Sequence, residues 1–515
     1  MSHLYPIGIQ NFEKIRKEGY VYVDKTAAIY DLFHTGSYYF LSRPRRFGKS
    51  LLLSTIEAYA EGRKELFEGL AIDGLEHEWL KYPILHLDLN SQAYDSEASL
   101  DSMLNDALSR WETVYGRRES ETTPSLRFQG VIQRAAEQCG QNVVILVDEY
   151  DKPLLQAIDD EALQEKFRNT LKAFYGALKS CDKYIRFAFL TGVTKFGKVS
   201  VFSDLNNLRD ITMLPKYADL CGITDEELMR YFREDIEVLA GEVGMSFDET
   251  CARLRENYDG YHFAKDSVGI YNPFSILNTL ASMEFDDYWF ETGTPTYLAR
   301  LLQQSNYNLE DIEHLTVKGG TLNSIDAYSG NPIPMIYQSG YLTLDRYNST
   351  FNTYTLKFPN REVKEGFMSF LLPLYTHVSS SKSVFAIQQF TEDVQKGRVD
   401  EFMQRLQTFF ADTPYELVSN REVHYQNVLY IIFRLLGFYV DVEYCTNRGR
   451  IDLVMKTDSV IYVMEFKLDG TASQALDQIN EKGYADPFFH DGRTIIKVGV
   501  NFDGETRNIG EWIVQ

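Results

Sequence analysis

Short apolar runs alternate with helix-like spacing of hydrophobic residues through the first 220 residues of the chain. Four runs have the length and character of strands, at 37–41, 82–90, 143–147 and 187–190. The run at 143–147 is wholly aliphatic, as expected for a strand buried on both faces. Residues 51–60 and 161–180 repeat hydrophobic positions every three or four residues, which predicts helices. Strands that alternate with helices predict an α/β fold with a doubly wound parallel sheet.

Beyond about residue 220 the hydrophobic spacing is mainly helical. Thr224 is the expected N-cap of one helix, as Asp24 is for a helix at 25–33. The aromatic turns at 258–262 and 271–274 are interpreted as capped turns packed between helices, with His262 structural rather than catalytic. Strand-like pieces at 340–344 and 354–358 indicate a small β element. If this element were a winged-helix module, it would offer a surface for DNA or for a partner.

The last hundred residues start a new pattern. An amphipathic helix at 423–436 ends at Gly437. Strands are expected at 439–444, 450–456, 460–466 and 493–502, with a helix at 474–484. We therefore divide the chain into four parts: a domain with the parallel sheet at 1–220, a mainly helical middle region at 221–365, a helical connector at 366–410 and an α/β domain at 411–515.

Composition and charge narrow the class of protein. The chain has 515 residues, enough for about three or four domains, and its 44% hydrophobic and 24% charged residues are typical of a soluble globular protein. A net charge of −22 excludes a general nucleic-acid coat and counts against a nuclease, although it allows a local basic channel. The longest apolar runs have only strand length, and the first ten residues lack the pattern of a secretory signal, so no membrane span is expected.

The five cysteines are widely spaced and never form a CxxC pair. This pattern predicts reduced thiols in a cytoplasmic protein, with neither a zinc site nor a disulfide framework.

The loop at 42–50, SRPRRFGKS, lies between an expected strand and an expected helix. Gly48, Lys49 and Ser50 match the end of a phosphate-binding loop, but Arg43 stands where the first glycine belongs. Backbone amides at the helix start would hold phosphate, Lys49 would neutralise it and Ser50 would ligate Mg²⁺. Arg43, Arg45 and Arg46 would add positive charge at the mouth. A basic turn without a ligand would explain this loop equally well.

A second motif favours the nucleotide site. The buried strand at 143–147 ends in Asp148 and Glu149. Asp148 would help to hold Mg²⁺, and Glu149 would polarise the attacking water. An acidic turn after a core strand would explain this motif but not both motifs in this order. The two together predict binding of ATP with Mg²⁺, and hydrolysis.

A third strand ends near Thr191 and Thr194, either of which could contact the γ-phosphate as a sensor or simply end the strand. Arg186 and Arg209 are further candidates for that contact, and a structural or surface role is the stronger interpretation for each. The residues expected to bind the nucleotide and its metal are Arg46, Gly48, Lys49, Ser50, Asp148 and Thr191, with Ser50 and Asp148 as metal ligands.

These motifs occur together with a leader at 5–26, ILVDEYDKPL at 145–154, LTGVTKF at 190–196, VFSDLNNLRDIT at 201–212 and IYNPFSIL at 270–277. In this combination the chain resembles a bacterial AAA-ATPase-like family over nearly its whole length. The family itself lacks the first glycine of the loop. The resemblance implies a P-loop ATPase domain, a leader that helps to wall the adenine site, and a nuclease-like domain at the C-terminus.

Near the C-terminus two expected strands each carry an acid. Asp452 follows Gly449 and Arg450, and Glu465 and Lys467 lie two residues apart on the next strand, so that they face the same side. Asp452 and Glu465 could share Mg²⁺ while Lys467 orients a hydroxide, as metal-assisted phosphodiester hydrolysis requires. A solvated hairpin with an ordinary Glu/Lys pair is the alternative.

This arrangement resembles the PD-(D/E)xK nuclease superfamily, which implies a restriction-endonuclease-like α/β domain. The preceding helix of that superfamily often supplies a further acid, for which Glu422 is the nearest candidate here, and Glu443 on the neighbouring strand competes with it. Gln478 and Tyr484 resemble the Gln and Tyr elements of that superfamily. Arg448, Arg450 and Lys467 would have to supply much of the local charge for DNA. The predicted catalytic residues of the chain are therefore Glu149, Asp452, Glu465 and Lys467.

Two functions remain open. In the first, ATP binding or hydrolysis controls Mg²⁺-dependent cleavage of DNA, and the ATPase domain could form a homo-oligomer. In the second, the chain is a nucleotide-switched regulatory or assembly protein whose nuclease-like domain is inactive and only binds a partner. In a third hypothesis, the protein only hydrolyses ATP and uses this hydrolysis to remodel a partner.

Overall fold

Two compact units make up the computed structural model, and each is built from two stretches of sequence. Unit 1 comprises Met1–Thr292 and His314–Glu362, and unit 2 comprises Gly293–Glu313 and Val363–Gln515. The four-part division made from the sequence stays a prediction.

The structure describes residues 3–196, 205, 207–292, 298, 301–302, 307–312, 315–322, 325, 331–376, 378–411, 421–437, 439, 441–447, 450–468, 470–503, 506 and 508–515. Within these ranges it leaves out the side chains of residues 291, 380, 421–423, 425, 443–447, 450–452 and 468.

A parallel five-stranded sheet forms the centre of unit 1, in the order β2-β3-β4-β1-β5. The strands are β1 (Tyr38–Ser42), β2 (Ile84–Asp88), β3 (Val143–Asp148), β4 (Ile185–Gly192) and β5 (Arg209–Asp210). β3 is buried along its whole length, as its aliphatic sequence predicts. This sheet, with helices on both faces, confirms the predicted doubly wound fold.

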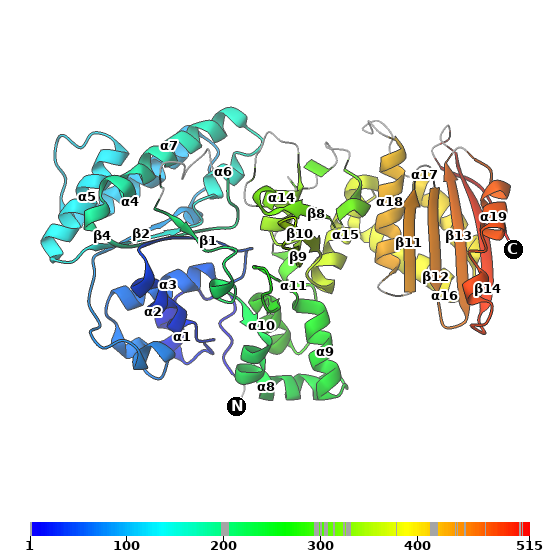
Figure 1. Cartoon of the computed structure of the whole chain (residues 1–515), viewed down its shortest axis with the longest axis horizontal. Helices are drawn as coiled ribbons and strands as arrows, with labels where there is room; N and C mark the ends of the chain where they lie inside the picture. Colours follow the sequence, from blue (N-terminus) through cyan, green and yellow to red (C-terminus); the bar gives the residue numbers. More distant parts are fainter. Residues whose placement is uncertain are drawn as a thin grey trace. The chain divides into compact units, whose positions relative to one another are not determined.

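Figure 1 shows one group of helices below this sheet and another group above it. The lower group is α1 (Phe12–Glu18), α2 (Thr26–Thr35) and α3 (Lys49–Ala60). The upper group is α4 (Glu97–Tyr115), α5 (Pro124–Cys139), α6 (Lys152–Gln156) and α7 (Glu161–Ser180). Lys25 is the N-cap residue of α2, one residue later than predicted, but the Asp24 carboxylate still accepts a hydrogen bond from Thr26 N at 2.8 Å.

The remainder of unit 1 is mainly helical with one small sheet. Its helices are α8 (Asp225–Glu242), α9 (Phe247–Tyr258), α10 (Pro273–Ser282), α11 (Tyr288–Glu291), α13 (Gly319–Leu322) and α14 (Ile333–Gln338). Thr224 caps α8 in a capping box with Glu227, as predicted. β6 (Ile223–Thr224) pairs with β7 (Ile270–Tyr271). An antiparallel sheet in the order β8-β10-β9 joins β8 (Thr316–Lys318), β9 (Thr343–Asn348) and β10 (Thr353–Lys357).

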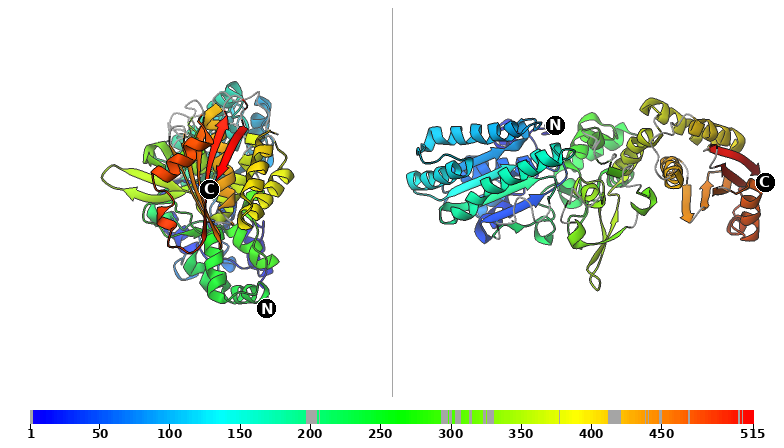
Figure 2. Two further views of the ribbon diagram at one scale, coloured as in Figure 1. Left: turned by 90° about the vertical axis from the view of Figure 1, so that its right-hand side faces the viewer. Right: turned by 90° about the horizontal axis from the view of Figure 1, so that it is seen from above.

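Unit 2 combines a mixed five-stranded sheet with helices (Figure 2). The helices are α15 (Arg361–Thr376, whose first two residues belong to unit 1), α16 (Ser380–Gln395), α17 (Val399–Ala411), α18 (Arg421–Leu436) and α19 (Ala472–Glu481). The sheet has the order β11 (Asp441–Asn447), β12 (Arg450–Lys456), β13 (Val460–Leu468), β14 (Thr494–Asp503) and β15 (Asn508–Val514). β13 and β14 are parallel, and the other neighbours are antiparallel.

Two features of unit 2 differ from the sequence prediction. β15 was not predicted, because its alternation is weak and it pairs with β14 through a register shift. The helix expected to be amphipathic is buried all round from Val428 to Phe433, since helices and the sheet cover it. No helix among the described residues is long and apolar enough to cross a membrane.

Candidate functional site

The loop between β1 and α3 begins with Arg43 and ends at Gly48. Gly48 has a φ of 94°, in the left-handed region that favours glycine, and is the N-cap residue of α3. Arg43 has no positive φ, so this position does not require a glycine. The loop thus keeps a helix N-terminus for binding phosphate, although its first glycine is absent.

Arg43 does not add charge at the mouth of the loop, contrary to the sequence prediction. Its side chain is 1% exposed and donates to the carbonyl oxygens of Thr212 at 2.8 Å and Tyr217 at 3.0 Å. Its guanidinium lies 4.2 Å from the ring centroid of Phe263, and burial lowers its pKa. Arg43 therefore ties the loop to the segment after β5, which the sequence could not reveal because these partners lie far along the chain.

Arg45 and Arg46 behave differently from Arg43. Arg46 is exposed, has a φ of 66° and lies 4.8 Å from the ring centroid of Phe274. Arg45 lies 5.1 Å from the ring centroid of Trp289. Both arginines line a hollow of about 350 Å³ together with Lys49, Ser50 and Glu149. The positive charge at the mouth therefore comes from Arg45 and Arg46.

The predicted nucleotide residues lie together at the carboxyl edge of the sheet. Ser50 Oγ donates to one Asp148 carboxylate oxygen at 2.5 Å, and Thr191 Oγ1 donates to the other at 2.6 Å. β4 lies between β1 and β3 in the sheet, so the end of β4 brings Thr191 to Asp148. A hydroxyl and a carboxylate in direct contact are the hard oxygen ligands that suit Mg²⁺.

Lys49 is held inside the loop. Its amine donates to the carbonyl oxygens of Arg43 at 3.1 Å and Pro44 at 3.3 Å, and lies 3.5 Å from the Glu149 carboxylate. Glu149 has a φ of 53°, an uncommon backbone conformation for this residue type and one concentrated at functional sites. Phosphate entering the hollow would compete with Glu149 for the Lys49 amine.

Asp151 is a buried acid that the sequence prediction missed. Its carboxylate accepts hydrogen bonds from Thr194 N at 2.6 Å and Thr194 Oγ1 at 2.5 Å. Burial, together with the charge of Glu149, raises the pKa of Asp151 to about 7. Its position three residues after Asp148 was the available signal. Thr194 therefore contacts Asp151, whereas the other predicted sensor, Thr191, contacts Asp148.

The two arginines considered for the γ-phosphate lie elsewhere. Arg186 donates to Phe33 O at 2.6 Å, which supports the structural role favoured for it, and Arg209 is exposed in β5.

A smaller apolar pocket of about 100 Å³ adjoins this hollow. The two share the lining residues Pro6, Gly48, Leu51, Pro273 and Leu277. The pocket is otherwise lined by Val21, Tyr22, Val23, Lys25, Phe47, Leu52, Leu220, Cys221, Gly222, Ile223 and Phe232. The leader thus supplies walls to both, next to the start of α3.

The predicted residues of the second site lie on β12 and β13 in unit 2. The backbone register places Asp452 opposite Glu465, and opposite positions of an antiparallel pair lie on one face. The side chain of Asp452 is outside the described part of the structure, as are the side chains of Glu422, Glu443 and Arg450 and the whole of Arg448.

Glu465 is fully buried, and Lys467 donates to the Gln478 side-chain oxygen on α19 at 2.7 Å. Tyr484 instead packs against a hydrophobic cluster around Ile461 and Ile479. No group of three or more His, Cys, Asp or Glu side chains that could hold a metal occurs among the described residues. A metal site here would therefore depend on Asp452 or on another acid whose side chain is not described.

Comparisons with known proteins match the two domains in which these predicted residues lie. A family described as a predicted AAA-ATPase, AAA-ATPase-like, matches residues 6–202, and the PD-(D/E)XK nuclease superfamily matches residues 420–512. A protein of Azotobacter chroococcum mcd 1, named as an uncharacterized protein in the vnfD 5′ region, is 34% identical over 99% of this chain and 98% of its own length. The chain belongs to the AAA-ATPase-like family.

The AAA-ATPase-like domain contains the loop, Asp148 and Thr191, and the PD-(D/E)XK domain contains Glu465 and Lys467. A solved structure, that of the Aeropyrum pernix ORC2 protein described as ADPNP–ADP complexes, is also similar to this chain. It has 10% sequence identity and a TM-score of 0.24, and the match covers 65% of this chain and 88% of that one.

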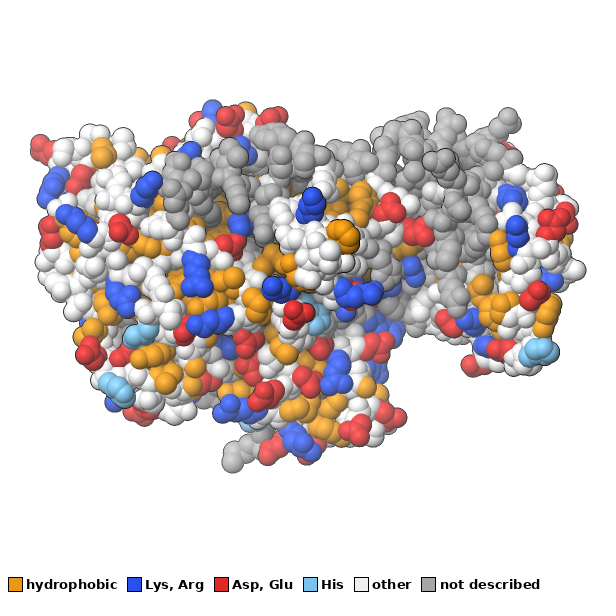
Figure 3. Space-filling model, viewed as in Figure 1, with side chains coloured by type: hydrophobic (Ala, Val, Ile, Leu, Met, Phe, Trp, Pro, Cys, Tyr) orange, Lys and Arg blue, Asp and Glu red, His pale blue; other side chains and the backbone are white. Residues whose placement is uncertain are grey.

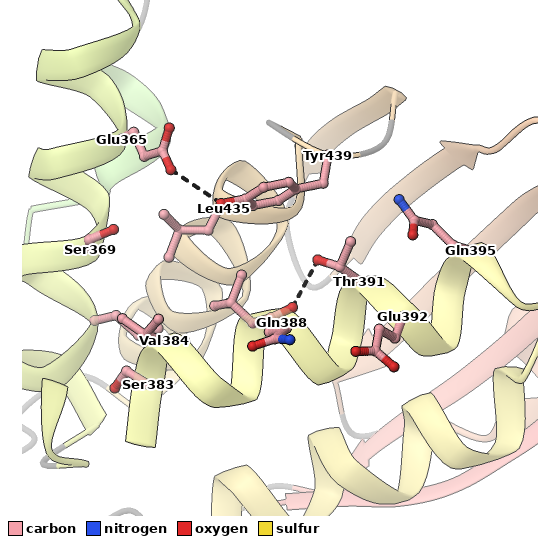
Figure 4. Close-up of a pocket in the computed structure, with 12 residues that line it drawn as sticks. Glu365, Ser369, Ser383, Val384, Gln388, Thr391, Glu392, Gln395, Leu435 and Tyr439 are labelled. Atoms are coloured by element: carbon pink, nitrogen blue, oxygen red, sulfur yellow. Dashed lines mark hydrogen bonds between the residues drawn. The ribbon is translucent and has the colours of Figure 1, made fainter. Parts of the chain in front are cut away.

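One further hollow, of about 490 Å³, lies between α15, α16 and the end of α18 in unit 2 of this AAA-ATPase-like protein. Figure 4 shows Glu365 on one wall and Gln388, Thr391 and Glu392 on α16. Its described lining contains no Lys, Arg or His and none of the predicted site residues. The candidate chemistry therefore does not lie in this hollow.

Proposed function

We propose that the protein is a Mg²⁺-dependent ATPase whose nucleotide cycle controls a nuclease domain acting on DNA. The observation that carries the ATPase part is the contact of Ser50 and Thr191 with the two oxygens of Asp148, beside Lys49 and Glu149. These five side chains are the set needed to bind a nucleotide phosphate and to activate water.

In this proposal the triphosphate occupies the hollow at the start of α3. Lys49, Arg46 and the backbone amides of the helix start bind the phosphates, and the smaller apolar pocket takes the adenine ring. Ser50 and Asp148 would hold Mg²⁺, which when bound would offset negative charge on the phosphates.

Glu149 is the proposed general base. In the structure its carboxylate lies beside the Lys49 amine. Phosphate that binds Lys49 would weaken this ion pair, because the amine would then be shared. Glu149 would then accept a proton from the attacking water. The action of Glu149 as a general base would therefore depend on a bound nucleotide.

In the nuclease domain, Asp452 and Glu465 would hold the metal that activates water. Lys467 would stabilise the attacking hydroxide or the phosphate, and the contact with Gln478 would keep its amine on the face of β13 shared with Glu465.

Separate assays test the two activities. Lys49→Ala and Glu149→Gln are expected to abolish ATP turnover. Glu465→Ala and Lys467→Ala are expected to abolish cleavage of DNA while leaving ATP turnover intact. Lys482→Ala, at an exposed position just after α19, is the matched control and should behave like wild type. Absence of DNA cleavage by wild type with Mg²⁺ or Mn²⁺ and ATP would refute the nuclease part.

The full burial of Glu465 favours a second candidate function, because a buried carboxylate is a poor site for exchange of a metal with solvent. In this case the protein would be a nucleotide-switched regulatory or assembly protein whose nuclease-like domain only binds a partner. ATP would then change the oligomer size of wild type but not of Lys49→Ala, as measured by light scattering. If the oligomer size of wild type is the same with and without ATP, this candidate function is excluded.

A further inference from the structure

The hairpin of β9 and β10 projects from the body of unit 1. Both views in Figure 2 show it as a narrow arm that ends in a turn. Phe351 lies in this turn and is 70% exposed, the largest exposed fraction of any large hydrophobic side chain that the structure describes. The aromatic ring at the tip of the arm is therefore accessible to a ligand.

Hydrogen bonds within the turn order the backbone around Phe351. Asn348 Oδ1 accepts from Thr350 N at 3.0 Å and from Phe351 N at 3.3 Å. Tyr347 donates its hydroxyl hydrogen to Asn352 Oδ1 at 3.1 Å, and its ring centroid lies 4.8 Å from that of Tyr354. The turn is therefore a formed structure that presents one aromatic ring.

The arm differs from the rest of the chain in charge. The chain carries a net charge of −22, but the hairpin at 343–357 contains two basic residues, Arg346 and Lys357, and only one acid, Asp345. Lys318 on β8 is exposed, and the Arg346 side chain is 78% exposed. The one acid on these three strands, Asp345, already pairs with Arg346 at 3.0 Å and with Lys357 at 3.2 Å. Figure 3 shows Lys and Arg side chains over this part of the molecule.

We infer that the hairpin is a DNA-contacting arm, in which Arg346 and Lys318 bind phosphates while Phe351 stacks against or wedges between bases. Basic side chains next to an exposed aromatic ring complement a polyanion that carries stacked bases. A protein could also cover the aromatic ring. However, nothing on the arm identifies a particular protein surface that would complement its positive charge. The inference rests on the proposed action on DNA and adds a binding site on the ATPase-bearing unit.

DNA binding by the full chain tests this arm independently of cleavage. All variants carry Glu465→Ala and Lys467→Ala, so that labelled duplex and single-stranded oligonucleotides stay intact during anisotropy titrations. Phe351→Ala is expected to weaken binding about tenfold with little change in salt dependence. Arg346→Gln with Lys318→Gln is expected to weaken binding at low salt and to reduce the salt slope by about 2.

Two exposed positions elsewhere in unit 1 provide matched controls. Val238→Ala removes an exposed hydrophobic side chain on α8, and Arg110→Gln removes an exposed arginine on α4 that also pairs with an aspartate. Both should bind DNA like the parent. A preference for duplex would indicate wedging, and a preference for single strands would indicate stacking.

The outcomes separate this inference from the proposed function. Unchanged DNA affinity in both arm variants, or equal losses in the controls, would overturn the inference even if wild type cleaves DNA. A change of oligomer size without a change in DNA affinity would also overturn it and would assign the arm to an interface between copies. Arm-dependent binding by a wild type that never cleaves DNA would support the inference and refute the nuclease.

Discussion

Arg43 gives the phosphate loop a buried anchor in place of a flexible glycine. Three carbonyl oxygens, those of Ser42, Thr212 and Tyr217, accept hydrogen bonds from its guanidinium within 3.0 Å. Because the backbone at this position has no positive φ, an arginine costs no backbone strain. The loop can therefore hold its shape through the side chain of the residue that departs from the usual pattern.

Restoring a glycine should harm the protein. Arg43→Gly would leave the carbonyl oxygens of Thr212 and Tyr217 without this donor, with an expected loss of about 3 kcal/mol in the free energy of unfolding. Urea unfolding measures this loss. Arg46→Gly is the matched control, because Arg46 is exposed and has a φ of 66°, which glycine adopts easily. A chain with Arg43→Gly as stable as wild type would contradict the anchoring role.

At the scale of elements, the first turn of α15 is attached to the phosphate loop through Trp289 on α11. The Trp289 indole donates to Arg45 O at 3.1 Å, and its backbone N–H donates to the Glu362 carboxylate at 2.6 Å. Ser275 on α10 donates to the same carboxylate at 2.8 Å, and burial raises the pKa of Glu362 to about 8. Trp289 therefore links Glu362, in the first turn of α15, to the loop between β1 and α3.

Removal of this connection is expected to weaken nucleotide binding. Trp289→Phe keeps an aromatic ring beside Arg45 but removes the hydrogen bond to Arg45 O, so the loop should lose order and ATP affinity should fall about fivefold, equivalent to about 1 kcal/mol. Calorimetric titration with ATP measures the effect. Trp111→Phe, where the ring stacks on Phe128 at 5.5 Å away from the loop, is the control. Equal ATP affinity in wild type and Trp289→Phe would exclude the connection.

Sequence patterns predicted the elements of the site but not how the middle region supports it. The strands, Lys49, Ser50 and Asp148 follow from local spacing, which fixes their place at the end of β1 and β3. The aromatic turns were interpreted only as packing. In the structure Phe263, which follows the first turn, and Phe274, in the second turn, lie against Arg43 and Arg46. Such pairs depend on residues more than 200 positions apart. Local propensity carries no information about them.

On the scale of the whole molecule, the two units share the chain in an interleaved way. Residues 293–313 belong to unit 2 although unit 1 continues after them. Asn427 on α18 is 2% exposed and shows why this segment is needed. Its carboxamide accepts from Leu309 N at 2.8 Å and donates to Tyr307 O at 2.8 Å. Leu309 and Ile312 are fully buried, so the segment also supplies hydrophobic contacts to unit 2.

This interleaving predicts that the effect of one substitution depends on the length of the chain. In the full chain Asn427→Leu leaves Leu309 N and Tyr307 O without their buried partner, and should reduce the free energy of unfolding of unit 2 by about 2 kcal/mol. In a fragment of residues 363–515 the segment is absent, so that fragment should unfold at lower urea concentration than unit 2 of the full chain.

Within the fragment the same substitution should be nearly neutral, because Asn427 has no backbone partners there to lose. Urea unfolding followed by circular dichroism compares the four proteins. The control in both lengths is Asn480→Leu on α19, which also removes two side-chain hydrogen bonds but at an exposed position. An equal loss of stability from Asn427→Leu in fragment and full chain would mean that residues 307 and 309 do not stabilise α18. A loss confined to the full chain would instead establish that unit 2 is completed by a segment inserted within the sequence of unit 1, which carries the AAA-ATPase-like domain.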